Sequence, residues 1–87
     1  MKIIAKQIEM IAWFKNDGTP KPLRFRMKNE DDTFSVIKVD RVIYNETEKL
    51  AGNPMILFMC QSLVNNIDVV YELKYEIKTC KWMLYKI

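Results

Sequence analysis

The chain has 87 residues and a formal net charge of +3, with 49% apolar and 29% charged residues. A chain of this length builds one hydrophobic core, so we expect a single domain over residues 1–87. The composition is typical of a folded globular protein and excludes a disordered or membrane-embedded one. Histidine is absent and glycine occurs only twice. These two facts exclude histidine-dependent catalysis, histidine zinc sites and glycine-rich phosphate loops.

Charge is distributed unevenly along the chain. Residues 1–28 carry seven basic and two acidic side chains, a net charge of +5. Residues 29–73 carry three basic and eight acidic side chains, a net charge of −5. Residues 74–87 carry four basic side chains and one acidic side chain, a net charge of +3. This asymmetry predicts an oriented surface field that steers a charged partner.

The N-terminus predicts no export signal, because only three apolar residues lie between Lys2 and Lys6. The longest apolar run, at residues 55–60, is too short to cross a bilayer. We therefore expect a cytoplasmic protein without a membrane partner. In that compartment Cys60 and Cys80 are expected to be free thiols, with a disulfide between neighbouring strands as the alternative.

The first predicted element is a hairpin that reverses at Asp17-Gly18, a preferred type I′ pair because both positions require positive φ. The alternating apolar residues then pair Ala12 with Leu23, Met10 with Phe25, and Ile8 with Met27. The opposite face pairs Ile11 with Arg24, Glu9 with Arg26, and Gln7 with Lys28. One side of this hairpin is therefore apolar, and the other holds a cross-strand ion pair.

A β strand is predicted next, over Thr33–Ile43, and the acidic turn at residues 29–32 leads into it. Residues 45–51 follow, with acidic residues near their start and Gly52 after their end. One short helical turn and a wide loop both fit this segment. The length of the acidic turn leaves two inward sets open for the strand, Phe34 with Val36 or Ser35 with Ile37.

A second hairpin is predicted around Asn65-Asn66. This turn pairs Val64 with Ile67, Ser62 with Val69, Cys60 with Tyr71, Phe58 with Leu73, and Ile56 with Tyr75. The register is well defined because a one-residue slip would exchange the two faces. A last strand over Trp82–Ile87 completes the chain, with either Trp82 or Tyr85 directed into the core.

The predicted fold is all-β, with six mainly antiparallel strands in a meander. No long amphipathic helix is available to cover one face of an open sheet. We therefore expect the sheet to curl into a small barrel of the SH3-like or Sm-like kind.

The leading candidate site is the reverse face of the second hairpin. Its apolar residues are Met55, Leu57, Met59, Leu63 and Val70. A contiguous apolar face of this kind is typical of an interface, and methionine suits an adaptable contact. The interpretation is a non-catalytic interaction module that binds a protein partner or forms a homodimer. The alternative is that residues 44–54 or the N-terminal segment cover this face.

A second candidate site lies on the polar face of the first hairpin. Its residues are Trp13, Lys15, Lys21, Arg24, Arg26 and Lys28. Cations that follow phosphates, beside a ring that stacks on bases, are how small barrels bind single-stranded nucleic acid. The alternative function is therefore nucleic-acid binding, against the simpler interpretation of an ordinary solvated face.

No pattern predicts catalysis, a cofactor or a metal. Two cysteines with nineteen residues between them form neither a zinc site nor a CxxC redox pair. The acidic residues 30–32 lack the alternate spacing of a calcium loop. We therefore expect a protein that is not an enzyme.

Four strings of the sequence carry a resemblance: PLRFR (22–26), FMCQS (58–62), ELKYE (72–76) and CKWMLYK (80–86). Together they resemble a group of short, uncharacterised bacterial proteins, from about Ile8 to the end of the chain. This resemblance implies a cytoplasmic bacterial protein and carries over no functional residue. More loosely, the chain is similar to the small barrels of YolD-like and WYL-type proteins, which implies an accessory or ligand-sensing module. The local match is Trp82-Met83-Leu84, where Met83 replaces the tyrosine of that pattern.

Overall fold

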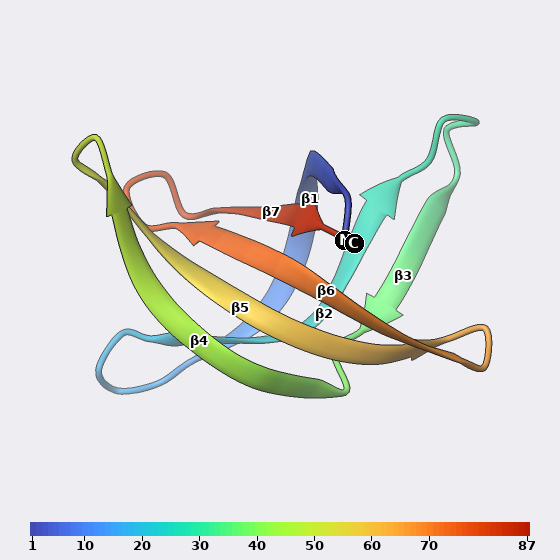
Figure 1. Cartoon of the computed structure of the whole chain (residues 1–87), viewed down its shortest axis with the longest axis horizontal. Coiled ribbons are helices and arrows are strands. Elements are labelled where there is room, and N and C mark those ends of the chain that lie inside the picture. Colours follow the sequence, from blue (N-terminus) through green and yellow to red (C-terminus); the bar gives the residue numbers. More distant parts are fainter.

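Seven antiparallel strands form one sheet in the computed structural model, which describes residues 1–87 apart from the side chain of Leu50. The strands are β1 (Ile3–Phe14), β2 (Pro20–Lys28), β3 (Phe34–Lys38), β4 (Arg41–Leu50), β5 (Asn53–Val64), β6 (Ile67–Glu76) and β7 (Lys81–Lys86). Their order across the sheet is β3-β2-β1-β7-β6-β5-β4 (Figure 1). The all-β prediction is therefore confirmed. In the described part of the chain, no helix is long and apolar enough to cross a membrane.

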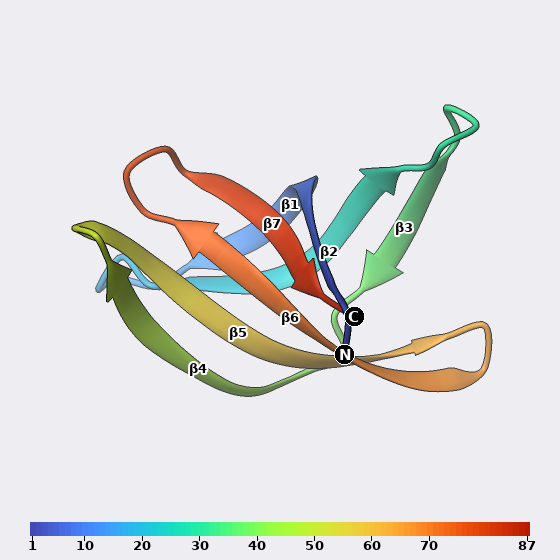
Figure 2. The ribbon, with the colours of Figure 1, turned by 45° about the horizontal axis from the view of Figure 1, so that its top comes forward.

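The sheet curls into a half-barrel because its two edge strands, β3 and β4, follow each other directly in the chain (Figure 2). The N–H of Val39 donates to the carbonyl of Leu23 in β2 at 2.9 Å, and the N–H of Asp40 donates to Gln61 in β5 at 3.1 Å. The two edges thus meet at this point. The single strand predicted over residues 33–43 is wrong, because the chain changes partner strand there. This break gives seven strands instead of six.

A buried hydrogen-bond network reinforces this junction. The Ser62 hydroxyl donates to the carbonyl of Lys38 at 2.6 Å and also bonds with the Tyr71 hydroxyl. Both side chains are fully buried, and burial raises the pKa of Tyr71 to about 12. The network ties the β5–β6 hairpin to the end of β3, so it stabilises the curl of the sheet.

The β5–β6 hairpin has the predicted register from end to end. Asn65 and Asn66 take φ values of +51° and +64°, which is the type I′ geometry that a two-residue loop favours. Phe58 lies opposite Leu73 and Cys60 lies opposite Tyr71. These four side chains are buried on the inner face, so the prediction for this hairpin is confirmed.

The turn between β1 and β2 differs from the predicted type I′ pair. Only Gly18 takes a positive φ there, +86°. The Lys15 N–H donates to the Thr19 carbonyl at 3.0 Å, and the Gly18 N–H donates to the Lys15 carbonyl at 2.9 Å. The loop is therefore one residue longer than predicted, a type I turn followed by a left-handed glycine.

A bulge in β2 compensates for the longer loop. Ala12 lies opposite Pro22 instead of Leu23, and the extra residue restores the predicted pairs Met10–Phe25, Ile11–Arg24 and Glu9–Arg26. The ladder begins at Glu9, so the two further predicted pairs, Gln7–Lys28 and Ile8–Met27, lie beyond it. Gln7 and Ile8 pair instead with Met83 and Trp82 of β7.

The loop at residues 29–33 repeats the hydrogen bonds of the loop at 15–19. Asn29 donates to the Thr33 carbonyl at 2.7 Å, and Asp32 donates to the Asn29 carbonyl at 3.1 Å. In both loops an aspartate accepts a hydrogen bond from the threonine two residues later, which lowers the pKa of Asp17 and of Asp31. Asp32 occupies the position of Gly18, with a φ of +67°.

Replacing Asp32 with glycine is therefore expected to raise the free energy of unfolding by about 0.5–1 kcal/mol, because glycine adopts positive φ without steric strain. The ion pair of Asp32 with Lys28, at 3.2 Å, is lost, but it is exposed and contributes little. Urea unfolding followed by circular dichroism measures the change. The control is Glu30→Gly, at a position without positive φ, which is expected to lower stability. A less stable Asp32→Gly protein would contradict the strain argument.

Residues 45–51 do not form the helical turn or wide loop predicted for them. They extend β4 to Leu50, where Ala51 and Gly52 make a two-residue turn into β5 with φ values of +51° and +78°. The β propensity of the preceding residues and the pairing with β5 override the local capping signals at Asn45 and Gly52.

The core lies on the inner face of the half-barrel. Its buried residues are Phe25, Ile37, Val39, Phe58, Cys60, Tyr71, Leu73, Tyr75, Trp82 and Leu84. The inward set of β3 is thus Ser35 with Ile37, whereas Phe34 and Val36 are exposed. In β7 the inward aromatic is Trp82, and Tyr85 sits at a bulge. The termini lie side by side, since Lys2 and Ile87 exchange backbone hydrogen bonds of 2.8 and 3.0 Å (Figures 1 and 2).

Candidate functional site

The outer face of β1, β2 and β3 combines cations with exposed apolar side chains, and we name it the cationic-aromatic face. Alternation places on it the residues Glu9, Ile11, Trp13, Lys21, Arg24, Arg26, Lys28, Phe34, Val36 and Lys38. It therefore carries five basic side chains and one acidic side chain. Apolar and basic side chains lie next to each other across the strands, as in the row Ile11–Arg24–Lys38.

The apolar side chains of this face are unusually exposed. The exposed fractions are 69% for Trp13, 64% for Ile11, 61% for Val36 and 50% for Phe34. A depression of about 390 Å³ lies among Ile11, Arg24, Arg26 and Val36. Apolar side chains gathered on one exposed face are typical of a binding surface.

Arg26 is held in place at the centre of the face. Its Nε lies 2.7 Å from Glu9 Oε1, and its guanidinium lies 4.5 Å from the centre of the Phe34 ring. The predicted Glu9–Arg26 ion pair is confirmed. The other cations of the middle strand are less engaged: Lys28 reaches Asp32 in the adjoining loop, and Arg24 lies between Ile11 and Lys38.

The structure brings most of the predicted basic site together. Lys21 lies opposite Trp13, and Arg24, Arg26 and Lys28 follow along β2. Lys15 is exposed in the adjoining loop, outside the face. The sequence interpretation missed Phe34, Val36 and Lys38, because it left the inward set of β3 open. The signal that identifies them is the length of the loop at residues 29–33.

The predicted apolar site on the outer side of β5 and β6 is partly covered by the chain itself. Leu57 is buried, with 6% of its surface exposed, and Met55 and Met59 are half-buried. Leu63 and Val70 remain exposed, at 57% and 44%. The structure therefore leaves open only the part of this face near the Asn65-Asn66 turn.

Side chains of the flanking strands provide this cover. Lys74 Nζ lies 2.7 Å from Glu48 Oε1, and the two residues face Leu57 and Met55 across β5. The same ammonium lies 3.8 Å from the centre of the Tyr85 ring. The ion pair thus connects β6 to β4 across β5, beside Leu57. Residues 44–50 belong to β4 and pair edge to edge with β5, so they do not fold over this face as the predicted alternative required.

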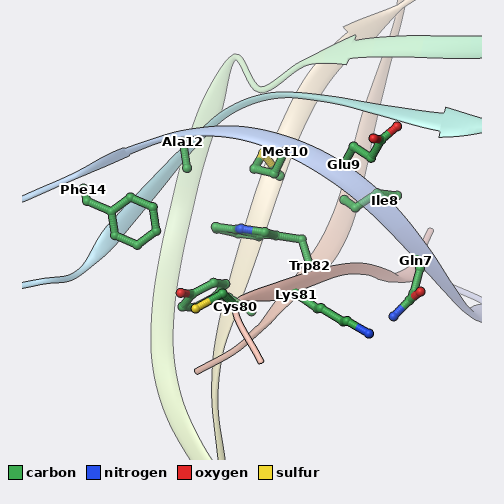
Figure 3. A pocket seen from close by; sticks show the side chains of 10 residues that line it. Gln7, Ile8, Glu9, Met10, Ala12, Phe14, Cys80, Lys81 and Trp82 are labelled. Atoms are coloured by element: carbon green, nitrogen blue, oxygen red, sulfur yellow. The ribbon is translucent and has the colours of Figure 1, made fainter. Parts of the chain in front are cut away.

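A cleft of about 530 Å³ opens between β1 and the start of β7 (Figure 3). Met10, Ala12 and Phe14 line one side, and Trp82 and Tyr75 line the other. Gln7, Glu9 and Lys81 lie at its polar margin. No sequence pattern indicated this cleft, because it forms where two strands distant in the chain diverge.

Both cysteines are free. Cys60 is fully buried, and burial raises the pKa of its thiol to about 12, whereas Cys80 is exposed. Among the described residues, no group of three or more Cys, Asp and Glu side chains is placed to hold a metal ion.

Iodoacetamide at mildly alkaline pH is therefore expected to alkylate Cys80 in the folded protein and Cys60 only after unfolding in urea. The thiolate is the reactive species, and Cys60 is both shielded and protonated. Intact-mass spectrometry counts the adducts. A Cys80→Ser protein should gain no adduct without urea, and rapid alkylation of Cys60 in native buffer would contradict the burial of its side chain.

No family model, curated protein or solved structure matches the chain. The resemblances noted in the sequence therefore remain predictions.

Proposed function

We propose that the chain is a non-catalytic protein that binds single-stranded nucleic acid through the cationic-aromatic face. The observation that carries this proposal is the exposure of Trp13 and Phe34 on the same three strands as five basic side chains. Exposed rings stack on bases of any identity, and cations between them neutralise phosphates.

The spacing of the cations favours an extended strand as the ligand. Arg24, Arg26 and Lys28 alternate along β2, so their Cα atoms are about 7 Å apart. They form a row along the middle strand, with Trp13 on one flank and Phe34 on the other. A duplex has its bases stacked on each other and offers no free base face to these rings, so single strands are the preferred class.

The test is fluorescence anisotropy of a labelled oligo(dT) or oligo(rU) titrated with the protein at several salt concentrations. With about three to five phosphates neutralised, the slope of log K against log salt is expected near −2 to −3.5. A duplex of equal length is expected to bind more weakly. Absence of binding to either oligonucleotide at low salt, or equal binding of a polyglutamate peptide, would overturn the proposal.

Association with a protein partner or a second copy is the second candidate. It is supported by the exposure of Leu63 and Val70 on the outer side of the β5–β6 hairpin, near its turn. The half-buried Met55 and Met59 and the buried Leu57 give it less support than the sequence suggested. Light scattering over a range of concentrations tests it, because a persistent monomer would exclude the homodimer.

A further inference from the structure

The ladder between β1 and β7 stops halfway along β1. Its last pair is Ile8 with Trp82, although β1 continues to Phe14. β7 cannot extend further, because Cys80 takes a φ of +59° and its N–H is bonded to the Glu76 carbonyl at 2.9 Å. Beyond Ile8, β1 therefore has β2 on one side and no partner strand on the other among the described residues.

Three residues of β1 direct their backbone groups to this open side. The Lys15 N–H bonds across the β1–β2 hairpin to Thr19, and successive residues of a strand address opposite edges. The backbone N–H and C=O groups of the odd-numbered residues Ile11 and Trp13 therefore point toward β2. Met10, Ala12 and Phe14 carry their N–H and C=O groups toward the cleft.

The side chains around this open edge form an apolar cleft. Met10, Ala12 and Phe14 lie along β1 and the Trp82 indole faces them from β7 (Figure 3). The rings of Tyr75 and Trp82 are 4.8 Å apart between centres, and the Phe14 ring meets Tyr75 edge-on at 6.1 Å. The cleft is thus bounded by the Ile8–Trp82 pair at one end and by the Phe14–Tyr75 contact at the other.

We propose that this cleft binds an extended peptide segment, which adds to β1 as a strand and continues the line of β7. Three pairs of backbone donors and acceptors, each two residues apart, match the hydrogen-bond pattern of a β strand and of no other common ligand. The margin carries one acid and one base, Glu9 and Lys81, so it does not select a charged ligand.

The geometry also defines what the peptide must contain. The free part of β1 accommodates about four residues of a partner strand. Every second side chain of that strand points toward Trp82 and Tyr75, so these positions are apolar and preferably β-branched. The site does not depend on the proposed nucleic-acid function, because along β1 its apolar lining is the inward set Met10, Ala12 and Phe14, whereas the cationic-aromatic face uses outward residues. Of the residues of that face, Glu9 alone also borders the cleft.

The test uses the Trp13→Phe protein, in which Trp82 is the only tryptophan and its emission reports on the cleft. The probes are capped hexapeptides that alternate valine and threonine, and the same peptides with N-methylated backbone amides as matched controls. We expect the unmodified peptide to shift Trp82 emission. It should also slow amide exchange at Met10, Ala12 and Phe14 at least tenfold, with no change at Ile11. N-methylation is expected to abolish both effects.

Two results would overturn the proposal: equal binding of the N-methylated peptides, and no change of emission or exchange with any unmodified peptide. Ala12→Leu, which fills the cleft, is expected to weaken peptide binding at least tenfold, whereas Ile11→Leu on the opposite face leaves it unchanged. Circular dichroism verifies folding of both variants, and the N-methylated peptides keep the test decisive if Ala12→Leu does not fold. Oligonucleotide binding is measured separately on the wild-type protein, so failure of one site is distinguishable from failure of the other.

Discussion

Replacing Phe58 with alanine is expected to lower the free energy of unfolding by about 3–5 kcal/mol. Phe58 is 2% exposed, faces Leu73 across the β5–β6 hairpin, and lies 5.5 Å from the Trp82 ring between centres. The half-barrel has a single core on one face of one sheet, so no second layer is available to fill the space left by the ring.

The expected loss is a large part of the free energy of unfolding of the protein. A domain of this size is stable by roughly 4–13 kcal/mol, so the Phe58→Ala protein should be largely unfolded if the wild type lies at the lower end. Urea unfolding at equilibrium, followed by far-ultraviolet circular dichroism, gives the difference.

Phe34→Ala provides the matched control, with the same atoms removed from a half-exposed ring. It loses the contact with Arg26 and is expected to cost less than about 1 kcal/mol. A Phe58→Ala protein within 1 kcal/mol of wild type would mean that the inner face is not the core.

The Trp13→Ala protein is expected to bind a short single-stranded oligonucleotide about 5- to 150-fold more weakly than wild type. Stacking of a base on an aromatic side chain contributes about 1–3 kcal/mol per base, as measured by alanine substitution. Trp13 is the most exposed aromatic of the cationic-aromatic face and lies opposite Lys21. Anisotropy titrations at fixed low salt measure the change.

Arginine and glutamate variants of the same face separate stacking from charge. Arg24→Ala is expected to weaken binding and to reduce the magnitude of the salt slope by about 0.7, since one phosphate contact is lost. Glu9→Gln is expected to strengthen binding, because it removes the single acid of the face and releases Arg26 from its ion pair.

Tyr44→Ala and Lys49→Ala are the controls for these variants. Both residues lie on β4, at the opposite edge of the sheet, and both variants should bind as wild type does. Equal losses in Trp13→Ala and Tyr44→Ala would show that binding is not localised on the proposed face.

Turn residues and apolar alternation were sufficient to predict the register of the β5–β6 hairpin, but not that of the β1–β2 hairpin. At Asn65-Asn66 the turn residues and the apolar alternation agree on one register, and the structure has that register. At Asp17-Gly18 the same reasoning misplaced the turn by one residue. The three pairs that β2 makes from Arg24 to Arg26 are nonetheless as predicted, because the bulge at Leu23 compensates for the longer loop. The extra loop residue and the bulge shift the register in opposite directions, so the alternation of apolar and polar residues farther along the strands gives no sign of either.

The candidate sites depended on tertiary structure to different degrees. Arg24, Arg26 and Lys28 share a face of β2 by alternation alone, so the sequence was enough to group them. Phe34 and Val36 join them only through the pairing of β3 with β2. The burial of Leu57 follows from side chains of β4, β6 and β7, which no short stretch of sequence brings together.

The sequence by itself determined an all-β protein, the inner and outer faces of its two long hairpins, and the absence of histidine chemistry. Those features depend on residue type and on a two-residue period, which are local properties. Only the tertiary structure decided that the strand after the acidic loop divides at Val39-Asp40 and that the sheet curls into a half-barrel. It also decided that β1 continues past the end of its pairing with β7, which opens a cleft. Each of these depends on which strand edges meet in space, because backbone hydrogen bonds form between any two edges of suitable register, whatever their separation in the chain.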